Sequence, residues 1–182
     1  MAPADGRDVE EPLGMTNKAL RALGIAAVVS MVLFWAWILS GGPKKPNPDE
    51  LDDRSYVTFA EQRCSRLRTD IEALPNALDA TSAAERADTI EEANGLLREM
   101  VDDLEARAPT AGKDHKRLSG WLADWRTYEG DRERYVDALR QDPGARFNVT
   151  EHPDFSDPVD EVIRVFADVN GMPACRVPGD VG

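Results

Sequence analysis

The feature that most constrains this chain is the uncharged stretch of residues 22–42. As a helix rising about 1.5 Å per residue, residues 22–39 alone would span most of a hydrocarbon layer roughly 30 Å thick. Trp35 and Trp37 lie near one end of the stretch, and indole side chains prefer the membrane interface. The sequence therefore predicts one N-terminal transmembrane helix.

The alternative for this stretch is a cleaved signal peptide. The apolar core of a signal peptide is about 7 to 15 residues long and ends at a small-x-small site. Here the apolar run is longer and follows a polar segment, although Ser40 and the two glycines after it offer small residues. The length favours an uncleaved signal anchor.

The anchor divides the chain into four predicted parts. They are a short polar tail at 1–21, the transmembrane anchor at 22–42, a Pro/Gly linker at 43–48 and a helical domain at 49–182. Three prolines make the linker a semi-stiff spacer. The last part has the usual size of one domain with a modest core.

Charge restricts the partners of the chain. The formal net charge is −12 and the isoelectric point is near 4.6. Nucleic acid and anionic lipid would both be repelled by such a field. No nucleic-acid partner is predicted, and the membrane span itself remains the expected membrane contact.

The positive-inside rule does not orient the anchor. Equal numbers of basic residues flank it, namely Arg7, Lys18 and Arg21 before it and Lys44, Lys45 and Arg54 after it.

The two cysteines, Cys64 and Cys175, both follow the anchor. An even pair in an exported domain favours a disulfide, which would close a loop of about 110 residues. The alternative is two unrelated buried thiols in a cytoplasmic domain.

The cysteine pair therefore decides the predicted location. We expect a single-pass protein of the cell membrane, with the N-terminus cytoplasmic and the C-terminal domain extracytoplasmic. Disulfides persist in oxidising compartments, so a bridge would fit that orientation.

Two helices are predicted at the start of the domain. Apolar residues at helical spacing run through 49–74, and Pro75 ends that helix. Ser82 and Glu85 form a capping-box pattern that starts a second helix, which ends near residues 108–109. The two helices should form an antiparallel hairpin. Asn94 lies on the second apolar stripe; a buried Asn would fix register, but a partly exposed Asn is expected.

The third predicted helix, residues 113–140, carries the most distinctive cluster of the chain. Its aromatic and basic members are Trp121, Trp125, Tyr128, Arg132 and Tyr135. They form either an aromatic core or a binding face for a sugar, lipid headgroup or partner. Helical spacing favours the core. Arg132 either extends its head to water or pairs with a buried carboxylate.

The rest of the domain completes a small up-and-down helical bundle. Residues 145–151 alternate in polarity and predict a short strand or β-like connector. Pro158 at the first helical position starts a fourth helix, which residues 170–171 cap. Residues 172–182 should be irregular except where Cys175 tethers them. The predicted fold class is all-α, with about four helices after the span.

No catalytic, metal or cofactor site is predicted. His115 and His152 are the only imidazoles, and neither has a second soft ligand at helical spacing. The acidic residues of the second helix lack the spacing of a calcium loop. Neither cysteine belongs to a redox or nucleophile motif. The chain is expected not to be an enzyme.

Two regions of the domain carry a further set of distinctive residues: residues 121–128, Asp131, Arg132 and Tyr135 in the first, and Phe166, Asn170, Met172, residues 174–175 and residues 178–181 in the second. In these residues the chain resembles a group of uncharacterised single-pass, membrane-anchored proteins of actinobacteria. The resemblance implies a cell-envelope location with one N-terminal span and brings no activity.

Architecture then gives the functional expectation. The domain should bind or support another envelope or membrane protein without enzymatic activity. A ligand-binding sensory module acting through a partner membrane protein is the second hypothesis. An enzyme acting on envelope polymers is the third.

Overall fold

The computed structural model describes residues 17–40 and 47–181, in two units, Met1–Pro46 and Asn47–Gly182. The first unit contains one helix, α1 (Asn17–Leu39), whose best 18-residue window has a mean hydropathy of 2.3. No residue of α1 is buried. A core helix of a soluble protein would be buried, so α1 has the length, composition and exposure of a helix that can span a membrane or serve as a signal sequence.

The second unit is all-α over the residues that the structure describes, which confirms the predicted fold class. It has four α-helices and two short 3-10 helices. In chain order these are α2 (Arg54–Glu72), η1 (Ala77–Asp79), α3 (Ala83–Arg107), α4 (Gly112–Gln141), α5 (Val159–Asn170) and η2 (Pro173–Cys175).

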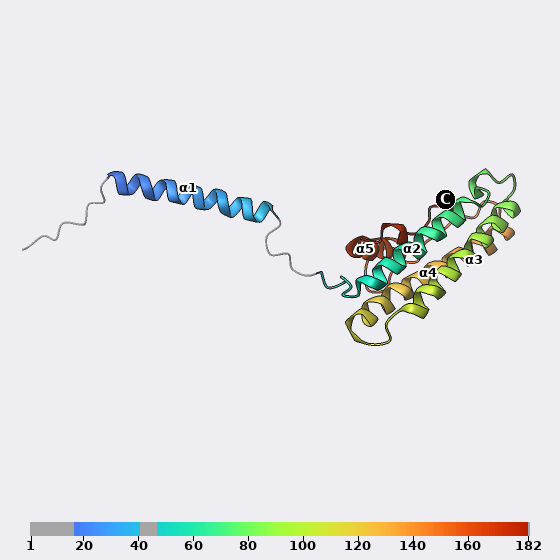
Figure 1. Ribbon diagram of the computed structural model, residues 1–182. Helices are drawn as coiled ribbons and strands as arrows, with labels where there is room; N and C mark the ends of the chain where they lie inside the picture. Colours follow the sequence, from blue (N-terminus) through green and yellow to red (C-terminus); the bar gives the residue numbers. More distant parts are fainter. Residues whose placement is uncertain (1–16, 41–46, 182) are drawn as a thin grey trace, which may run out of the picture. The chain divides into compact units, whose positions relative to one another are not determined.

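The three long helices of this unit, α2, α3 and α4, lie side by side (Figure 1), and α3 runs antiparallel to both α2 and α4. Ion pairs fix the register of α3 against α4: Arg98 bonds Glu133, Arg126 bonds Glu105, and Arg140 bonds Glu91. The α3 members of these pairs run from Glu105 back to Glu91 while the α4 members run from Arg126 on to Arg140, which is the order expected for antiparallel helices. On the other side of α3, Tyr56 of α2 donates to the Leu104 carbonyl at 3.0 Å. The predicted α2–α3 hairpin is present.

The fourth side of the bundle is built from short pieces. Helix α5 packs on α4, and η2 packs on both α2 and α5. The main apolar core lies among α2, α3, α4 and α5. A smaller cluster at the other end takes in Ala77, Ala87, Ile90, Tyr135, Val136, Leu139 and Val181. Residues 176–181 form no helix or strand, and they run from η2 on the main core to Val181 in the smaller cluster.

Two helix starts differ from the prediction. The first bundle helix begins at Arg54 rather than at residue 49, because the Asp53 carboxylate caps it by accepting from the N–H groups of Ser55 and Tyr56. In α5, Pro158 is the N-cap rather than the first helical residue. At the other end of α5, Gly171 has φ 70°, a left-handed cap that favours glycine.

The predicted β-like connector is not a strand in the described residues. Residues 145–149 do alternate between half-buried and exposed, but their backbone joins no neighbouring strand. One isolated bridge links Glu151 to Pro158. The alternation instead turns Phe147 inward, where its ring lies 5.9 Å from Tyr128 and 5.4 Å from Tyr135.

The capping box of α3 is formed in modified geometry. The Ser82 hydroxyl accepts from the Glu85 N–H at 3.2 Å, as the pattern predicts. The Glu85 carboxylate reaches past Ser82 and accepts from the N–H and hydroxyl of Thr81. These hydrogen bonds lower the pKa of Glu85.

Candidate functional site

The two cysteines form the disulfide that the sequence predicts. Cys64 of α2 and Cys175 of η2 are joined at 2.04 Å, across a sequence separation of 111 residues. Both are almost completely buried, and the Met100 sulfur of α3 lies 3.8 Å from that of Cys64. The bond fastens the last short helix of the domain to the first long one.

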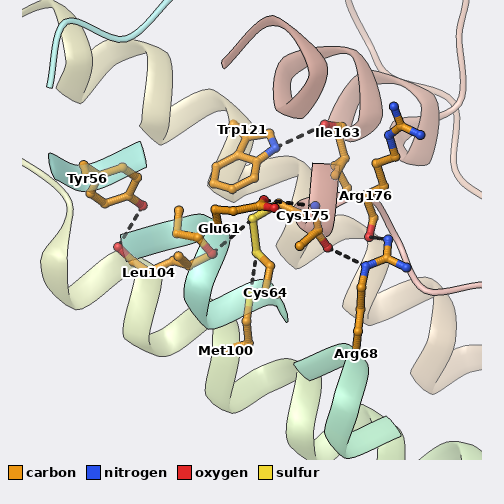
Figure 2. The surroundings of a disulfide bond; sticks show 12 residues. Tyr56, Glu61, Cys64, Arg68, Met100, Leu104, Trp121, Ile163, Cys175 and Arg176 are labelled. Carbon is orange, nitrogen blue, oxygen red and sulfur yellow. Dashed lines mark hydrogen bonds between the residues drawn. A yellow bond between two sulfur atoms is a disulfide. The ribbon is translucent and has the colours of Figure 1, made fainter. Parts of the chain in front are cut away.

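Polar contacts hold η2 on both sides of the disulfide (Figure 2). The Glu61 carboxylate accepts from the Ala174 N–H at 3.0 Å. Arg68, one turn beyond Cys64, donates to the carbonyls of Ala174 and Arg176 at 2.7 and 2.9 Å. The main chain is therefore held where it leaves the disulfide toward residue 176.

The aromatic side chains singled out on α4 form a buried row. Trp121 lies edge-on to Trp125, and Trp125 lies edge-on to Tyr128, with centroids 6.2 and 6.1 Å apart. Phe166 of α5 stacks on Trp121 at 5.1 Å. Tyr135 continues the row through Phe147. Exposures of 4% or less put these four α4 rings inside the domain rather than on a binding face.

Arg132 is the most unusual buried residue of the domain. It has no exposed surface, and its Nη1 and Nη2 donate to the two carboxylate oxygens of Asp180, each at 2.7 Å. Its Nε donates to Asn94 Oδ1 at 2.6 Å. Of the two alternatives for Arg132, the structure has the specific pair with a carboxylate.

Asn94 corrects an expectation. It is only 6% exposed, so the expected partly exposed side chain is wrong. The physical reason is Arg132, whose Nε–H would lack an acceptor inside the bundle without the Asn94 oxygen. A buried guanidinium needs hydrogen-bond partners for its donors as well as a counter-charge.

The pairing also changes the pKa values of this layer. Burial by itself would lower the pKa of Arg132, but the Asp180 carboxylate reverses that effect and the net shift is upward. Burial raises the pKa of Tyr128, whose ring lies 5.9 Å from the guanidinium. Arg132 thus stays charged and Tyr128 stays neutral.

Residues 176–181, which we call the strap, are held over most of their length. Besides the contacts of Arg68 and Arg132, the Tyr128 hydroxyl donates to the Pro178 carbonyl at 3.5 Å. Arg86 of α3 donates to the Val181 carbonyl at 2.8 Å. The expectation that only Cys175 tethers this irregular segment is therefore incomplete.

The beginning of the domain is fastened by buried polar side chains in the same way. Asn170 accepts from the Leu51 N–H at 2.8 Å and donates to the Asp49 carbonyl at 3.1 Å. Asp114 accepts from the N–H groups of Asp52 and Asp53. Burial acts to raise the pKa of Asp114, but these hydrogen bonds and Arg117 outweigh it and the net shift is downward.

Two more buried carboxylates of α4 hold the connector between α4 and α5. Asp131 accepts from the N–H and hydroxyl of Thr150 at 2.8 and 2.6 Å. Asp124 lies 3.3 Å from His152 Nε2. The pKa of Asp124 is raised by burial, which the nearby His152 opposes.

A common pattern connects these contacts. Of the seven polar side chains buried in the described part of the chain, five fasten segments outside the helices: Asn170, Asp114, Asp131, Asp124 and Arg132. Arg63 pairs with Asp103, and Asn94 supports Arg132. Sequence analysis considered a buried polar side chain only for Arg132 and Asn94, because the partners of the others lie far away in the chain.

Open spaces of different sizes lie at the bundle surface. One cavity of about 370 Å³ lies between the strap, the end of α2 and the middle of α3. A second, of about 530 Å³, lies beside the α3–α4 turn near His115 and Arg126. Among the described residues, no group of three or more His, Cys, Asp or Glu side chains is placed to hold a metal ion.

Fold and site together define a small disulfide-bridged helical domain that follows a candidate membrane span. Comparison of the chain with protein-family models, curated proteins and solved structures finds no match.

Proposed function

We propose that this chain is a single-pass protein of the cell envelope whose extracytoplasmic helical domain binds or supports another envelope or membrane protein, without enzymatic activity. The observation that carries the proposal is the Cys64–Cys175 disulfide in a domain that follows an exposed, apolar N-terminal helix. Disulfides form and persist mainly in oxidising compartments. The resemblance to membrane-anchored actinobacterial proteins agrees with this location.

The use of the buried polar residues supports a binding or structural role. Catalytic groups commonly lie in a cleft with a nucleophile, acid or base directed at open space. Here the side chains of Arg132, Asp114 and Asp131 form hydrogen bonds with irregular segments of the same chain. These contacts give a domain with well-fixed ends and a surface that is free to serve recognition.

The short linker supports a role close to the membrane. Residues 40–46 separate α1 from Asn47, and an extended chain covers at most about 3.6 Å per residue. The partner of the domain is therefore expected near the extracytoplasmic face of the cell membrane.

Topology is tested with single reporter cysteines while the native disulfide stays intact. Ser119→Cys places a thiol on the exposed face of α4, and Ala4→Cys places one before the anchor. With a membrane-impermeant maleimide on intact cells, we expect labelling of the first and not of the second until lysis. The reverse pattern would put the domain in the cytoplasm and overturn the proposed location.

The binding role is tested by site-specific photo-crosslinking from exposed positions such as Ser65, Ser119 and Glu133. A discrete adduct with one envelope or membrane protein is expected from at least one position. Uniform absence of adducts, in cells where the reporter cysteines confirm export, would contradict the binding role and leave the topology standing.

A further inference from the structure

The strap forms no helix or strand and bends at Arg176 and Gly179, and helix side chains hold its main chain. Helix side chains donate three hydrogen bonds to main-chain carbonyls of the strap and one to the carbonyl of Ala174, just before it. Arg68 donates to Ala174 and Arg176, Tyr128 donates to Pro178, and Arg86 donates to Val181. Contacts of this kind recognise an extended backbone whatever side chains it carries.

Side-chain contacts add selectivity. Arg176 pairs with Asp168 of α5, and Val177 packs against the main core. Further along, Pro178 is buried and the contacts of Asp180 and Val181 are the most specific.

The Asp180 carboxylate accepts hydrogen bonds from both terminal nitrogens of Arg132, in the bidentate geometry that distinguishes a carboxylate from other acceptors. The Val181 side chain is 3% exposed and lies in the cluster of Ala77, Ile90 and Tyr135. The groove thus selects an acidic side chain followed by an aliphatic one.

Arg132 favours a carboxylate in the groove. Asn94 satisfies only its Nε, and its two terminal nitrogens are paired by Asp180 of the strap. If the strap left, these nitrogens would exchange the bidentate pair for water. A second carboxylate-bearing segment would restore the pair, so the groove is expected to prefer such a segment to other peptides.

The groove is also larger than the strap. The cavity of about 370 Å³ has Pro178, Gly179 and Asp180 on one side and apolar residues such as Ile71, Leu74 and Ala93 on the other. A Cβ added at Gly179 meets no atom within 4 Å. Gly179 is exposed and lines the cavity, so a longer side chain at this position meets open space.

We infer that the strap groove is a peptide-recognition site, held in this structure by the chain's own residues 176–181. Its partner is an extended segment of another protein with an apolar side chain, then a carboxylate, then a small aliphatic side chain. This inference rests on the proposed role in binding another protein. The disulfide precedes the strap, so exchange does not require reduction.

The test uses the full chain, purified in detergent with its disulfide intact, and a variant that ends at Arg176. The probes are N-terminally fluorescent, C-terminally amidated pentapeptides: Val-Pro-Gly-Asp-Val, the same with Leu for Gly, and each with Asn for Asp. By fluorescence anisotropy, we expect saturable binding to the shortened chain and none to the intact chain. Leu for Gly should tighten binding severalfold, and Asn for Asp should weaken it at least tenfold.

A second variant keeps the test decisive if the shortened chain does not fold. Asp180→Asn in the intact chain weakens the hold of the strap, so added Val-Pro-Leu-Asp-Val should raise the Tm in proportion to its concentration, since a ligand that binds only the folded state stabilises it. The Asn peptide is the matched control. Absence of binding by a folded shortened chain, equal effects of both peptides, or no change in Tm up to millimolar peptide would overturn the inference.

Dimers of the intact chain formed by exchanged straps would also overturn it, because the occupant would then be a second copy. Size-exclusion chromatography of the same samples reads this outcome. None of these measurements depends on which side of a membrane the domain occupies. Their failure is thus distinguishable from failure of the proposed location.

Discussion

At Cys175 the C-terminal segment is joined to α2 by a covalent bond, whereas at Asp180 it is joined to α4 by a buried ion pair. Both attachments lie in the interior of the same bundle. The disulfide acts mainly by restricting the unfolded chain. The ion pair acts in the folded state, because separating its members exposes Arg132 to an environment that cannot solvate its charge. The disulfide fixes where the segment begins, and the ion pair favours a carboxylate at position 180.

The largest predicted effect comes from removing the acidic member of the ion pair. Asp180→Ala leaves the fully buried Arg132 without a counter-charge and should lower the free energy of unfolding by about 3 to 5 kcal/mol. Urea denaturation followed by circular dichroism, with the chain in detergent, measures the change.

The ion pair is also predicted to be asymmetric. The Asp180 side chain keeps 17% exposure, whereas that of Arg132 has none, so Arg132→Met leaves a carboxylate that water can reach. This variant should cost clearly less than Asp180→Ala, and the double variant should recover part of the loss. Equal costs for the two single variants would mean that burial of the guanidinium is not the source of the effect.

Removal of the disulfide should come next in size. The chain-entropy model gives about 4 to 5 kcal/mol for a loop of this length, and measured effects are often smaller, so we expect about 3 kcal/mol for Cys64→Ala with Cys175→Ala. Ser65→Ala, on the exposed side of α2, is the control. A change under about 1 kcal/mol in the same urea titration would show that the polar contacts of Glu61 and Arg68 hold η2 without the bond.

Asp114 makes a third attachment, at the start of the domain, where it holds residues 52–53. Asp114→Ala removes the acceptor for two main-chain N–H groups, those of Asp52 and Asp53, and should cost about 2 kcal/mol at neutral pH. The pKa of Asp114 is lowered in the folded state, so its stabilisation is present above the unfolded value of about 3.9 and is lost as pH falls through the folded value.

The measurement for Asp114 is therefore the difference in unfolding free energy between variant and parent as pH is lowered. That difference should shrink below about pH 4. Asp137→Ala, which alters an exposed carboxylate on the same helix, should show neither the cost nor the pH dependence. A cost that stays constant through the acid range would assign the effect of Asp114 to packing rather than to its charge.

These fastenings also show how far the sequence could predict the structure. Helices, the α2–α3 hairpin and the aromatic row of α4 follow from periodicity within one element. The disulfide followed from having only two cysteines. Asp180 and Asp114 were not predictable, because each is one of 34 acidic residues and its partner comes from a distant part of the chain. The helix start at Arg54 has a local signal, the N-cap Asp53, which the prediction did not use. The contacts of Asn170 and Asp114 with residues 49–53 come from distant parts of the chain and were not predictable.

The smallest predicted effect has the opposite sign and comes from a buried carboxylate that no arginine neutralises. Asp124 is 8% exposed and has His152 at 3.3 Å as its ionic partner. Burial raises its folded pKa above the unfolded value, so in the wild-type chain stability falls as pH rises through the folded value. Asp124→Asn removes that charge while keeping the size of the side chain and an oxygen near His152.

We therefore expect Asp124→Asn to raise the free energy of unfolding at pH 7 by less than about 1 kcal/mol, and to reduce this gain as pH falls toward the folded pKa of Asp124. Urea titrations at pH 7 and pH 5 measure both quantities. A loss of stability at pH 7 would mean that the Asp124–His152 pair is itself a net attachment of the connector. The contrast with Arg132 would then depend on the geometry of the partner rather than on whether the partner carries a fixed charge.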